Sequence, residues 1–265
     1  MVSIAILGAA GRMGQKLVAC SRDFPDLKVT AAIEVEGCPA LGRDAGVLAG
    51  GEALGVPVTT WADAAKFDVA IDFTFHAAVP GNIAAARAKG ATGYILGTTG
   101  LSADEKAAVE AAAGSMPVVW APNFSLGVNL LLSLARQAGA LLDDSYDVEI
   151  VEMHHRHKKD APSGTAIGLA EAVAAGRGVD LDKEACYGRQ GIVGERPAGQ
   201  IAIHALRGGD VVGDHTVIFA ADGERVEITH KASDRAAFAR GALRAASWVT
   251  GRAPGVYSMA QVLGL

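Results

Sequence analysis

The stretch Val2-Ser3-Ile4-Ala5-Ile6-Leu7-Gly8-Ala9-Ala10-Gly11-Arg12-Met13-Gly14 decides the fold of this 265-residue chain. Its first six residues form a short apolar run that predicts a buried strand, and a helical pattern follows through Cys20. Three glycines, Gly8, Gly11 and Gly14, lie where the strand gives way to the helix. Such glycines permit a tight turn, close approach of a pyrophosphate to the backbone, and close packing of helix on strand. The stretch therefore predicts the first strand and helix of an α/β sheet.

The glycine spacing is a variant of a dinucleotide-binding fingerprint. The usual form is G-x-G-x-x-G, and here Ala9-Ala10 stands where x-G is expected. An acid supports this interpretation, because Glu34 ends the next apolar run and lies twenty residues after Gly14. A carboxylate at that distance accepts hydrogen bonds from the ribose hydroxyls of adenosine. The predicted nucleotide-binding residues are Gly8, Ala9, Ala10, Gly11, Arg12, Met13 and Glu34.

The first half of the chain goes on alternating between strands and helices. Strands are expected at 67–74, 93–97 and 117–121, and helices at 80–89 and up to residue 113 after a capping Ser102. This repetition predicts an α/β fold with a Rossmann-type doubly wound parallel sheet, whose ligands bind beyond the carboxyl ends of the strands. Turns that follow the strands are therefore expected to face the cofactor, and the candidate residues are Gly97, Thr98, Thr99, Ala121, Pro122, Asn123 and Phe124.

After Phe124 the pattern changes and predicts a second, smaller α+β domain. A helix is expected at 126–142, then strands at 146–154, 200–206, 215–220 and 225–231 in a mixed or antiparallel sheet, with a long loop at 179–197. Ser233 or Asp234 is expected to cap a helix that runs to Val249, and a short helix covers 259–263. The predicted domains are 1–125, completed by helices in 234–265, and 126–233 for substrate binding and oligomerisation.

The stretch His154-His155-Arg156-His157-Lys158-Lys159-Asp160-Ala161-Pro162-Ser163-Gly164-Thr165 carries the chemistry. It places three imidazoles and two ammonium groups in six positions, before a turn and an apolar run that Ser163 can cap as a helix. A helix N-terminus offers unpaired N–H groups to an anion, so the segment suits a dianionic small molecule that needs a proton. A solvated basic loop is the plainer alternative. A zinc site on the three histidines is another, but their spacing is not typical of zinc, and no metal is expected.

Composition indicates an ordinary enzyme of a reducing compartment. The net charge of −5 and the pI near 5.8 argue against a nucleic-acid partner. Cys20, Cys38 and Cys186 are scattered and odd in number, which favours the cytoplasm and no disulfide frame. The chain begins with its first strand, so no signal peptide is expected, and no apolar run reaches membrane-spanning length.

Taken together, these residues resemble the 4-hydroxy-tetrahydrodipicolinate reductase family, also called dihydrodipicolinate reductase. The resemblance covers essentially the whole chain, and its most specific part runs from Glu152 to Ala166. The other matching segments are 8–14, 72–74, 97–100, 123–129, 194–196, 213–216 and 228–233.

The resemblance implies a reaction and a set of site residues. A reduced nicotinamide delivers hydride to the cyclic imine dicarboxylate formed from 4-hydroxy-tetrahydrodipicolinate, giving tetrahydrodipicolinate in diaminopimelate and lysine biosynthesis. His154 and Lys158 take the catalytic roles, and which of them gives the proton stays open. The substrate is held by His155, Ser163, Gly164 and Thr165, while 97–99 and 121–124 border the nicotinamide. The resemblance also implies a homotetramer joined through the sheets of the second domain.

Two departures from the family pattern concern the cofactor. Many members place Arg directly after the ribose-binding acid, and many have a basic residue after Asp-Phe-Thr. This chain has Val35 and Phe75 at those positions. Glu34 suits the free hydroxyls of NADH and repels a 2′-phosphate, and Arg12 and Arg43 are weaker partners for that phosphate than an adjacent Arg. We therefore expect NADH to be preferred, with NADPH used less well.

Two other functions remain open on the sequence. One is a different two-domain NAD(P)-dependent dehydrogenase that acts on an amino acid or a semialdehyde. A semialdehyde enzyme needs a nucleophilic Cys near a strand–helix turn, and none of the three cysteines fits that position well. The other is a non-catalytic nucleotide sensor, which would have no use for the His-Lys cluster.

Overall fold

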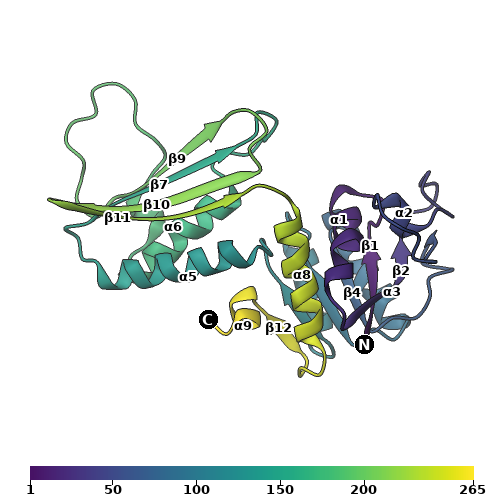
Figure 1. Cartoon of the computed structure of the whole chain (residues 1–265). Helices are drawn as coiled ribbons and strands as arrows, with labels where there is room; N and C mark the ends of the chain where they lie inside the picture. Colours follow the sequence, from purple (N-terminus) through teal and green to yellow (C-terminus); the bar gives the residue numbers. More distant parts are fainter. The chain divides into compact units, whose positions relative to one another are not determined.

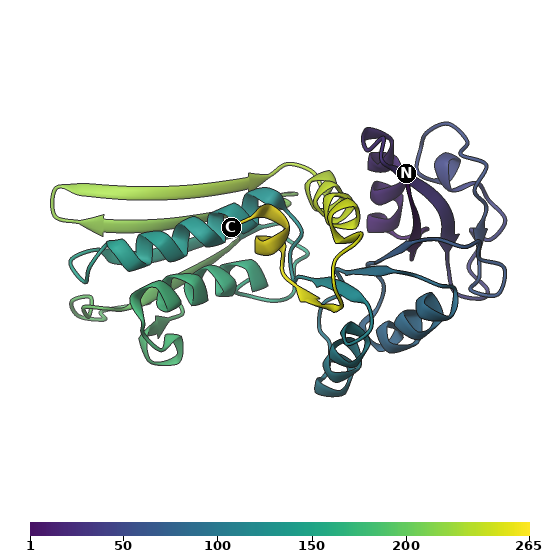
Figure 2. The same ribbon diagram turned by 90° about the horizontal axis from the view of Figure 1, so that it is seen from below.

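The computed structural model describes all 265 residues, which divide into two compact units. Unit 1 comprises Met1–Leu126 together with Arg235–Leu265, and unit 2 comprises Gly127–Asp234. Figure 1 and Figure 2 show the elements of each unit from two directions. The roles in binding and assembly that we expect for the two predicted domains stay predictions.

Unit 1 is built on a seven-stranded parallel sheet with the order β12-β6-β5-β4-β1-β2-β3. Its strands are β1 (Val2–Leu7), β2 (Leu27–Ile33), β3 (Val58–Thr59), β4 (Val69–Asp72), β5 (Gly93–Leu96), β6 (Pro117–Trp120) and β12 (Gly255–Tyr257). The strand order runs outward in opposite directions from β1 and β4, so the switch point of the sheet lies between these two strands. This arrangement confirms the predicted doubly wound sheet.

Helices cover both faces of this sheet because its strands are apolar on both sides. In β1, Ile4 and Ile6 belong to one core, while Ala5 and Leu7 belong to the other. The first core is covered by α1 (Arg12–Cys20), α2 (Ala45–Leu48), α8 (Ala236–Val249) and α9 (Met259–Leu263), and the second by α3 (Val79–Ala88) and α4 (Ala103–Ala113). Short 3₁₀ turns lie at Ser21–Asp23 and His76–Ala78.

Unit 2 contains a five-stranded mixed sheet with the order β11-β10-β7-β9-β8. Its strands are β7 (Asp147–His154), β8 (Ala185–Cys186), β9 (Ile201–Arg207), β10 (Gly213–Ala221) and β11 (Glu224–Ala232). Strand β7 pairs antiparallel with β10 and parallel with β9. Helices α5 (Leu126–Leu141) and α6 (Gly164–Arg177) pack on one face, where Val148 and Ile150 of β7 enter the core (Figure 1). No helix of unit 2 covers the other face.

The structure corrects two expectations and adds elements that the pattern did not reveal. The segment 179–197 is not one long loop, because it contains α7 (Leu181–Glu184), capped by the Asp180 carboxylate, and β8. The last long helix begins at Ala236, so its capping position falls on Arg235, later than the predicted Ser233 or Asp234. Elements α2, β3 and β12 have two to four residues each, which is too short for a hydrophobic periodicity to show in the sequence.

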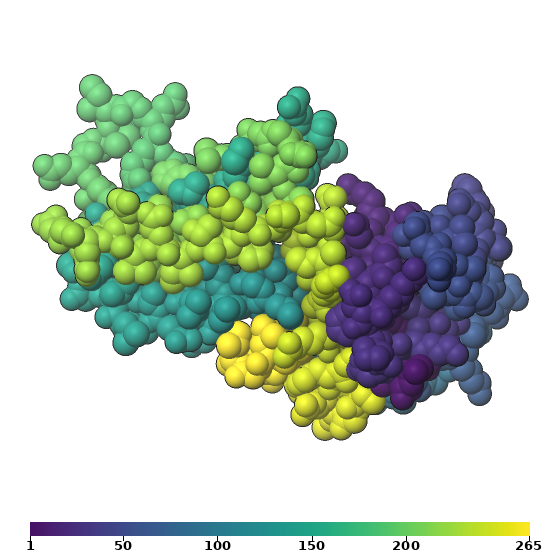
Figure 3. Space-filling model, viewed as in Figure 1, coloured from purple at the N-terminus to yellow at the C-terminus, as the bar shows by residue number.

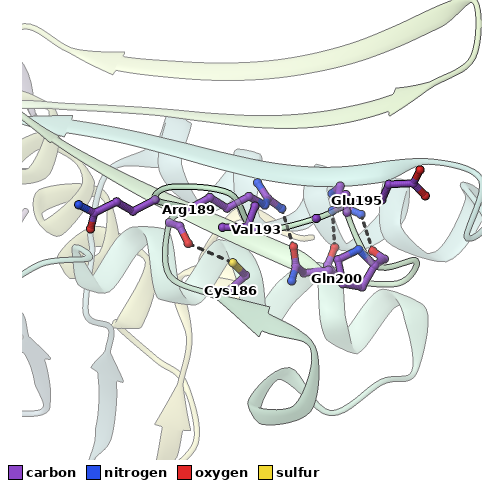
Figure 4. Close-up of a pocket in the computed structure, with 10 residues that line it drawn as sticks. Cys186, Arg189, Val193, Glu195 and Gln200 are labelled. Carbon is purple, nitrogen blue, oxygen red and sulfur yellow. Dashed lines mark hydrogen bonds between the residues drawn. The ribbon is translucent and has the colours of Figure 1, made fainter.

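A loop at 187–200 stands out from the body of unit 2 (Figure 3) and encloses a pocket of about 440 Å³ (Figure 4). Arg189 and Arg196 anchor it, since both donate to the Glu149 carboxylate on β7 at 2.9–3.0 Å. Burial by itself raises the pKa of Glu149, but bonds from Arg189, His204 and Arg196 outweigh burial and lower it to about 2. None of the predicted site residues lines this pocket.

Candidate active site

The glycine loop after β1 has the shape that a dinucleotide site requires. Gly8 has a φ of +70°, a left-handed conformation that favours glycine. A Cβ on Gly14 would lie 2.2 Å from the Gly8 carbonyl oxygen, so only glycine lets α1 begin this close to β1. A Cβ on Gly11 would meet that oxygen alone, at 3.2 Å, which leaves room for a ligand beside the loop.

The predicted ribose-binding acid lies against this loop. One Glu34 oxygen accepts a hydrogen bond from the Ala10 N–H at 2.9 Å, and the other accepts from the Val35 N–H at 3.3 Å. Val35 is 71% exposed and Phe75 is 65% exposed. Both are uncharged, so neither supplies the positive charge that many family members have at these two positions. Arg12 is exposed at the start of α1. These contacts put a carboxylate where the ends of β1 and β2 meet.

Asp72, at the end of β4, organises two neighbouring turns, a role that sequence reasoning missed. Its carboxylate is fully buried and accepts five hydrogen bonds within 3.0 Å. The donors are Thr74 N–H, Thr74 Oγ1, Thr98 Oγ1, Asn82 Nδ2 and the Tyr94 hydroxyl. The Asp72 charge and, above all, burial raise the pKa of Tyr94 well above its ordinary value, so this hydroxyl stays a donor. The signal in the sequence that could have revealed this role is the position of Asp72, an acid at the end of an otherwise apolar strand.

The turns after β5 and β6 border a pocket of about 320 Å³ within unit 1. Three of the predicted cofactor residues, Thr98, Thr99 and Pro122, line it, and Lys106 of α4 adds a cation. Three other predicted residues support the turns instead of lining the pocket. A Cβ on Gly97 would overlap the Phe73 ring. Asn123 Oδ1 accepts a hydrogen bond from the Ser125 N–H. The Phe124 ring packs in the core against the Phe73 ring.

In unit 2, the alternation of β7 places Glu152 and His154 on the face that carries the core residues Val148 and Ile150. The His154 ring is almost buried, and its Nδ1 lies 2.6 Å from Glu152 Oε2. A Cβ on Gly213 of β10 would lie 3.0 Å from His154 Nε2. The predicted catalytic histidine is thus held at one ring nitrogen, and its other nitrogen faces Gly213, where any side chain would crowd it.

Ser163 starts α6 and joins the helix to the histidine cluster. Its hydroxyl accepts from the Ala166 N–H at 3.2 Å, as a capping residue does, and lies 3.0 Å from His215 Nε2. The His154 and His215 rings meet edge to face, 5.2 Å apart. Burial, assisted by the nearby charge of His154, lowers the pKa of His215 to about 4, so this ring is neutral at neutral pH.

The remaining predicted residues lie in the loop after β7 and at the start of α6. Lys158 Nζ pairs with the Asp160 carboxylate at 2.9 Å. His155 Nδ1 accepts from the His157 N–H at 3.2 Å, outside the buried cluster, so the three histidines do not converge on one point. A Cβ on Gly164 would meet nothing within 4 Å, which leaves the N-terminus of α6 open beside Thr165.

The chain is similar to known proteins over essentially its whole length. A family model described as the N-terminus of dihydrodipicolinate reductase matches residues 2–124, and the model for its C-terminus matches 127–263. A 4-hydroxy-tetrahydrodipicolinate reductase of Anaeromyxobacter dehalogenans is 54% identical over 100% of this chain and 98% of its own length. One of Thiobacillus denitrificans is 52% identical over 100% and 99% of the two chains.

Solved structures share the fold. A dipicolinate-bound dihydrodipicolinate reductase from Paenisporosarcina superimposes with a TM-score of 0.72 at 24% identity, over 97% of both chains. An apo scyllo-inositol dehydrogenase from Lactobacillus casei gives 0.57 at 14% identity, over 99% of this chain and 92% of the other.

Fold and site together define a two-domain oxidoreductase with a Rossmann-type unit and a nicotinamide cofactor. The chain belongs to the dihydrodipicolinate reductase family. Its reaction is therefore the reduction that gives tetrahydrodipicolinate in diaminopimelate and lysine biosynthesis. This family assignment replaces the two alternatives left open by the sequence. No helix of the chain is both long and apolar enough to cross a membrane.

Proposed function

We propose that His154 and Lys158 are the catalytic residues of this reductase and that the start of α6 binds a substrate carboxylate. The observation that carries the proposal is the buried Glu152–His154 pair beside the capped helix. His155, Ser163, Gly164 and Thr165 complete the proposed substrate site. The dipicolinate bound by the Paenisporosarcina relative is a planar dicarboxylate, which supports a site for two carboxylates.

The proposed chemistry follows from charge. The nicotinamide supplies the hydride when it is bound, and addition to a conjugated imine builds negative charge on the substrate ring. His154, as an imidazolium, neutralises that charge by giving a proton, which is the role that histidine most often takes in general acid–base catalysis. Lys158 offers an ammonium to the substrate, and the N–H groups at the start of α6 offer hydrogen bonds to a carboxylate.

We propose that unit 1 binds the cofactor and prefers NADH to NADPH. The glycine loop 8–13 leaves room for the pyrophosphate, Glu34 faces the ribose, and the turns 97–99 and 121–124 border the nicotinamide. A 2′-phosphate would meet the Glu34 carboxylate, and the neighbouring Val35 offers no charge to offset the repulsion. A single interaction with a charged group is worth about 1.5–3 kcal/mol, so the preference for NADH is roughly 10- to 150-fold.

We further propose a cytoplasmic homotetramer joined through the sheets of unit 2. The sheet face that no helix of unit 2 covers carries apolar side chains, among them Val151, Leu206 and Ile218. Free cysteines throughout the chain suit a reducing compartment. Sedimentation equilibrium tests the assembly, and a monomer at micromolar concentration would contradict it.

A coupled assay tests the catalytic proposal. The substrate is generated from pyruvate and aspartate semialdehyde by its synthase, this protein is added, and nicotinamide absorbance is followed with NADH and with NADPH. We expect turnover that needs both the synthase and this protein, with a higher kcat/KM for NADH. Turnover that survives replacement of both His154 and Lys158 would contradict the assigned roles.

A further inference from the structure

The proposed mechanism rests on the Glu152–His154 pair but gives Glu152 no role of its own, although this carboxylate is fully excluded from solvent. Burying a charged carboxylate is costly unless every oxygen finds a partner. Glu152 Oε1 accepts from the Ser163 N–H at 3.0 Å and from Arg207 at 2.9 Å. Its Oε2 accepts from Arg207 at 2.8 Å and lies 2.6 Å from His154 Nδ1.

The Arg207 guanidinium fixes the plane of this carboxylate. Both of its terminal nitrogens bind Glu152, one to each oxygen, and one also donates to the Asp160 carbonyl at 2.7 Å. The parallel pairing of β7 with β9 puts Arg207 beside His154 and so in reach of the acid. Burial raises the pKa of Glu152, but bonds from Arg207, His154 and Ser163 outweigh burial, so the pKa is lowered and the group is ionised.

An ionised carboxylate at this distance dictates the state of the neighbouring ring. Glu152 can only accept, so His154 Nδ1 must carry a hydrogen, and Nε2 is left as the nitrogen that gains or gives a proton. At the Nε2 side, β10 presents Gly213, whose missing side chain keeps that nitrogen clear. Of the other charged or titratable groups, Arg207 on β9 shares Glu152 with the ring and His215 on β10 packs against the ring. Lys158 in the following loop and His230 on β11 act electrostatically on His215.

We propose that Glu152, held by Arg207, is a positioning residue that orients His154 for proton transfer through Nε2 and stabilises its charged form. The inference rests on the proposed role of His154 as proton donor. Glu152 does not touch the substrate in this proposal, and its effect on turnover passes through the imidazole.

Glu152→Gln tests the proposal because it keeps the shape and removes the charge. We expect kcat near neutral pH to fall roughly 10- to 100-fold, the loss typical when the carboxylate behind a metal-binding histidine is replaced. The alkaline limb of the kcat profile should move to lower pH by about one unit, because the charged ring loses its partner. KM for the substrate and affinity for NADH should stay within about twofold. Glu149→Gln, the same change on the other face of β7, should leave the position of the profile unchanged.

A double substitution separates positioning from general disruption. If Glu152 acts through His154, then Glu152→Gln should lower kcat by less than about twofold in a His154→Gln background. A full 10- to 100-fold fall in that background, or an unmoved pH profile in the single variant, would overturn the proposal. An active His154→Gln enzyme would instead overturn the role of His154, and an inactive unmodified protein would overturn the proposed function itself.

Nitrogen NMR of the unmodified protein gives a readout that needs no Glu152 variant to fold. With ¹⁵N-labelled histidine, the ring signals of His154, assigned by their loss in His154→Gln, should show Nδ1 protonated at every pH where the enzyme works. Nε2 should change protonation with the alkaline limb of activity. A neutral ring with its proton on Nε2 would refute the orientation that we propose.

Discussion

Replacing Gly164 with Val puts a side chain where we expect a substrate carboxylate to bind. Gly164 is the first residue of α6, a position where the backbone N–H has no partner within the helix. Its φ is not in the left-handed region, and a Cβ there would meet nothing within 4 Å. The fold therefore has no need of glycine at this position, and a loss of binding can be assigned to the ligand.

The expected size of the effect comes from one lost hydrogen bond to a charged group. Such a bond contributes about 1.5–3 kcal/mol, which corresponds to roughly 10- to 150-fold in affinity. The helix itself should lose nothing, because glycine is the poorer helix former, by a few tenths of a kcal/mol. The melting temperature of Gly164→Val should accordingly match that of the unmodified protein within a few degrees.

Calorimetric titration with pyridine-2,6-dicarboxylate, at saturating NADH, measures the loss directly. NADH affinity should not change. Gly168→Ala is the matched control, because it lies in the same helix and its Cβ would make only an ordinary contact with Leu132 at 3.6 Å. Equal dicarboxylate affinity in Gly164→Val and the unmodified protein would refute the reasoning and move the anion site elsewhere.

Four further substitutions probe catalysis, cofactor choice and stability. His154→Gln and Lys158→Ala should each lower kcat roughly 10²- to 10⁴-fold in steady-state assays while NADH affinity holds, and a near-normal kcat would reject the residue concerned. Val35→Arg should raise kcat/KM for NADPH and leave that for NADH nearly unchanged; an unmodified protein that favours NADPH would contradict the basis of this design. The pKa of Glu149 is lowered to about 2 in the folded chain, against an ordinary value of 4.5. The ionised carboxylate therefore adds at most about 3 kcal/mol to the free energy of unfolding above about pH 5, and this contribution is lost as the pH falls to about 2. Urea unfolding across that range should show a shallower pH dependence in Glu149→Gln, measured at one protein concentration.

Sequence predicted the fold well where elements are long and their polarity is regular. The apolar run of β1 and the glycine loop predicted the sheet. The capping Ser102 predicted the start of α4, where the structure contains a capping box of Ser102 with Glu105. Strands β3 and β12 have two and three residues, and each forms by pairing with a longer neighbouring strand. No local sequence pattern therefore predicts them.

The part of the candidate site that lies in unit 2 could be predicted only partly from the sequence. Glu152 and His154 stand two residues apart, and strand alternation alone places them on one face. Arg207 and His215 join them through the pairing of β7 with β9 and β10, and that register is a property of the folded sheet. A sequence pattern predicts which side chains share a strand face, but not which distant strand will lie beside it.

The division of the chain has a consequence for its synthesis. Unit 1 needs residues from both ends of the sequence, because α8 fills its core and β12 forms the edge of its sheet. Unit 2 is one continuous segment with its own core. On the ribosome, the segment made in the middle can therefore finish folding first, while the sheet begun by the earliest residues waits for the last thirty or so to emerge. A chain that ends at Asp234 and has been released from the ribosome should then resist protease in its second unit and remain sensitive in its first.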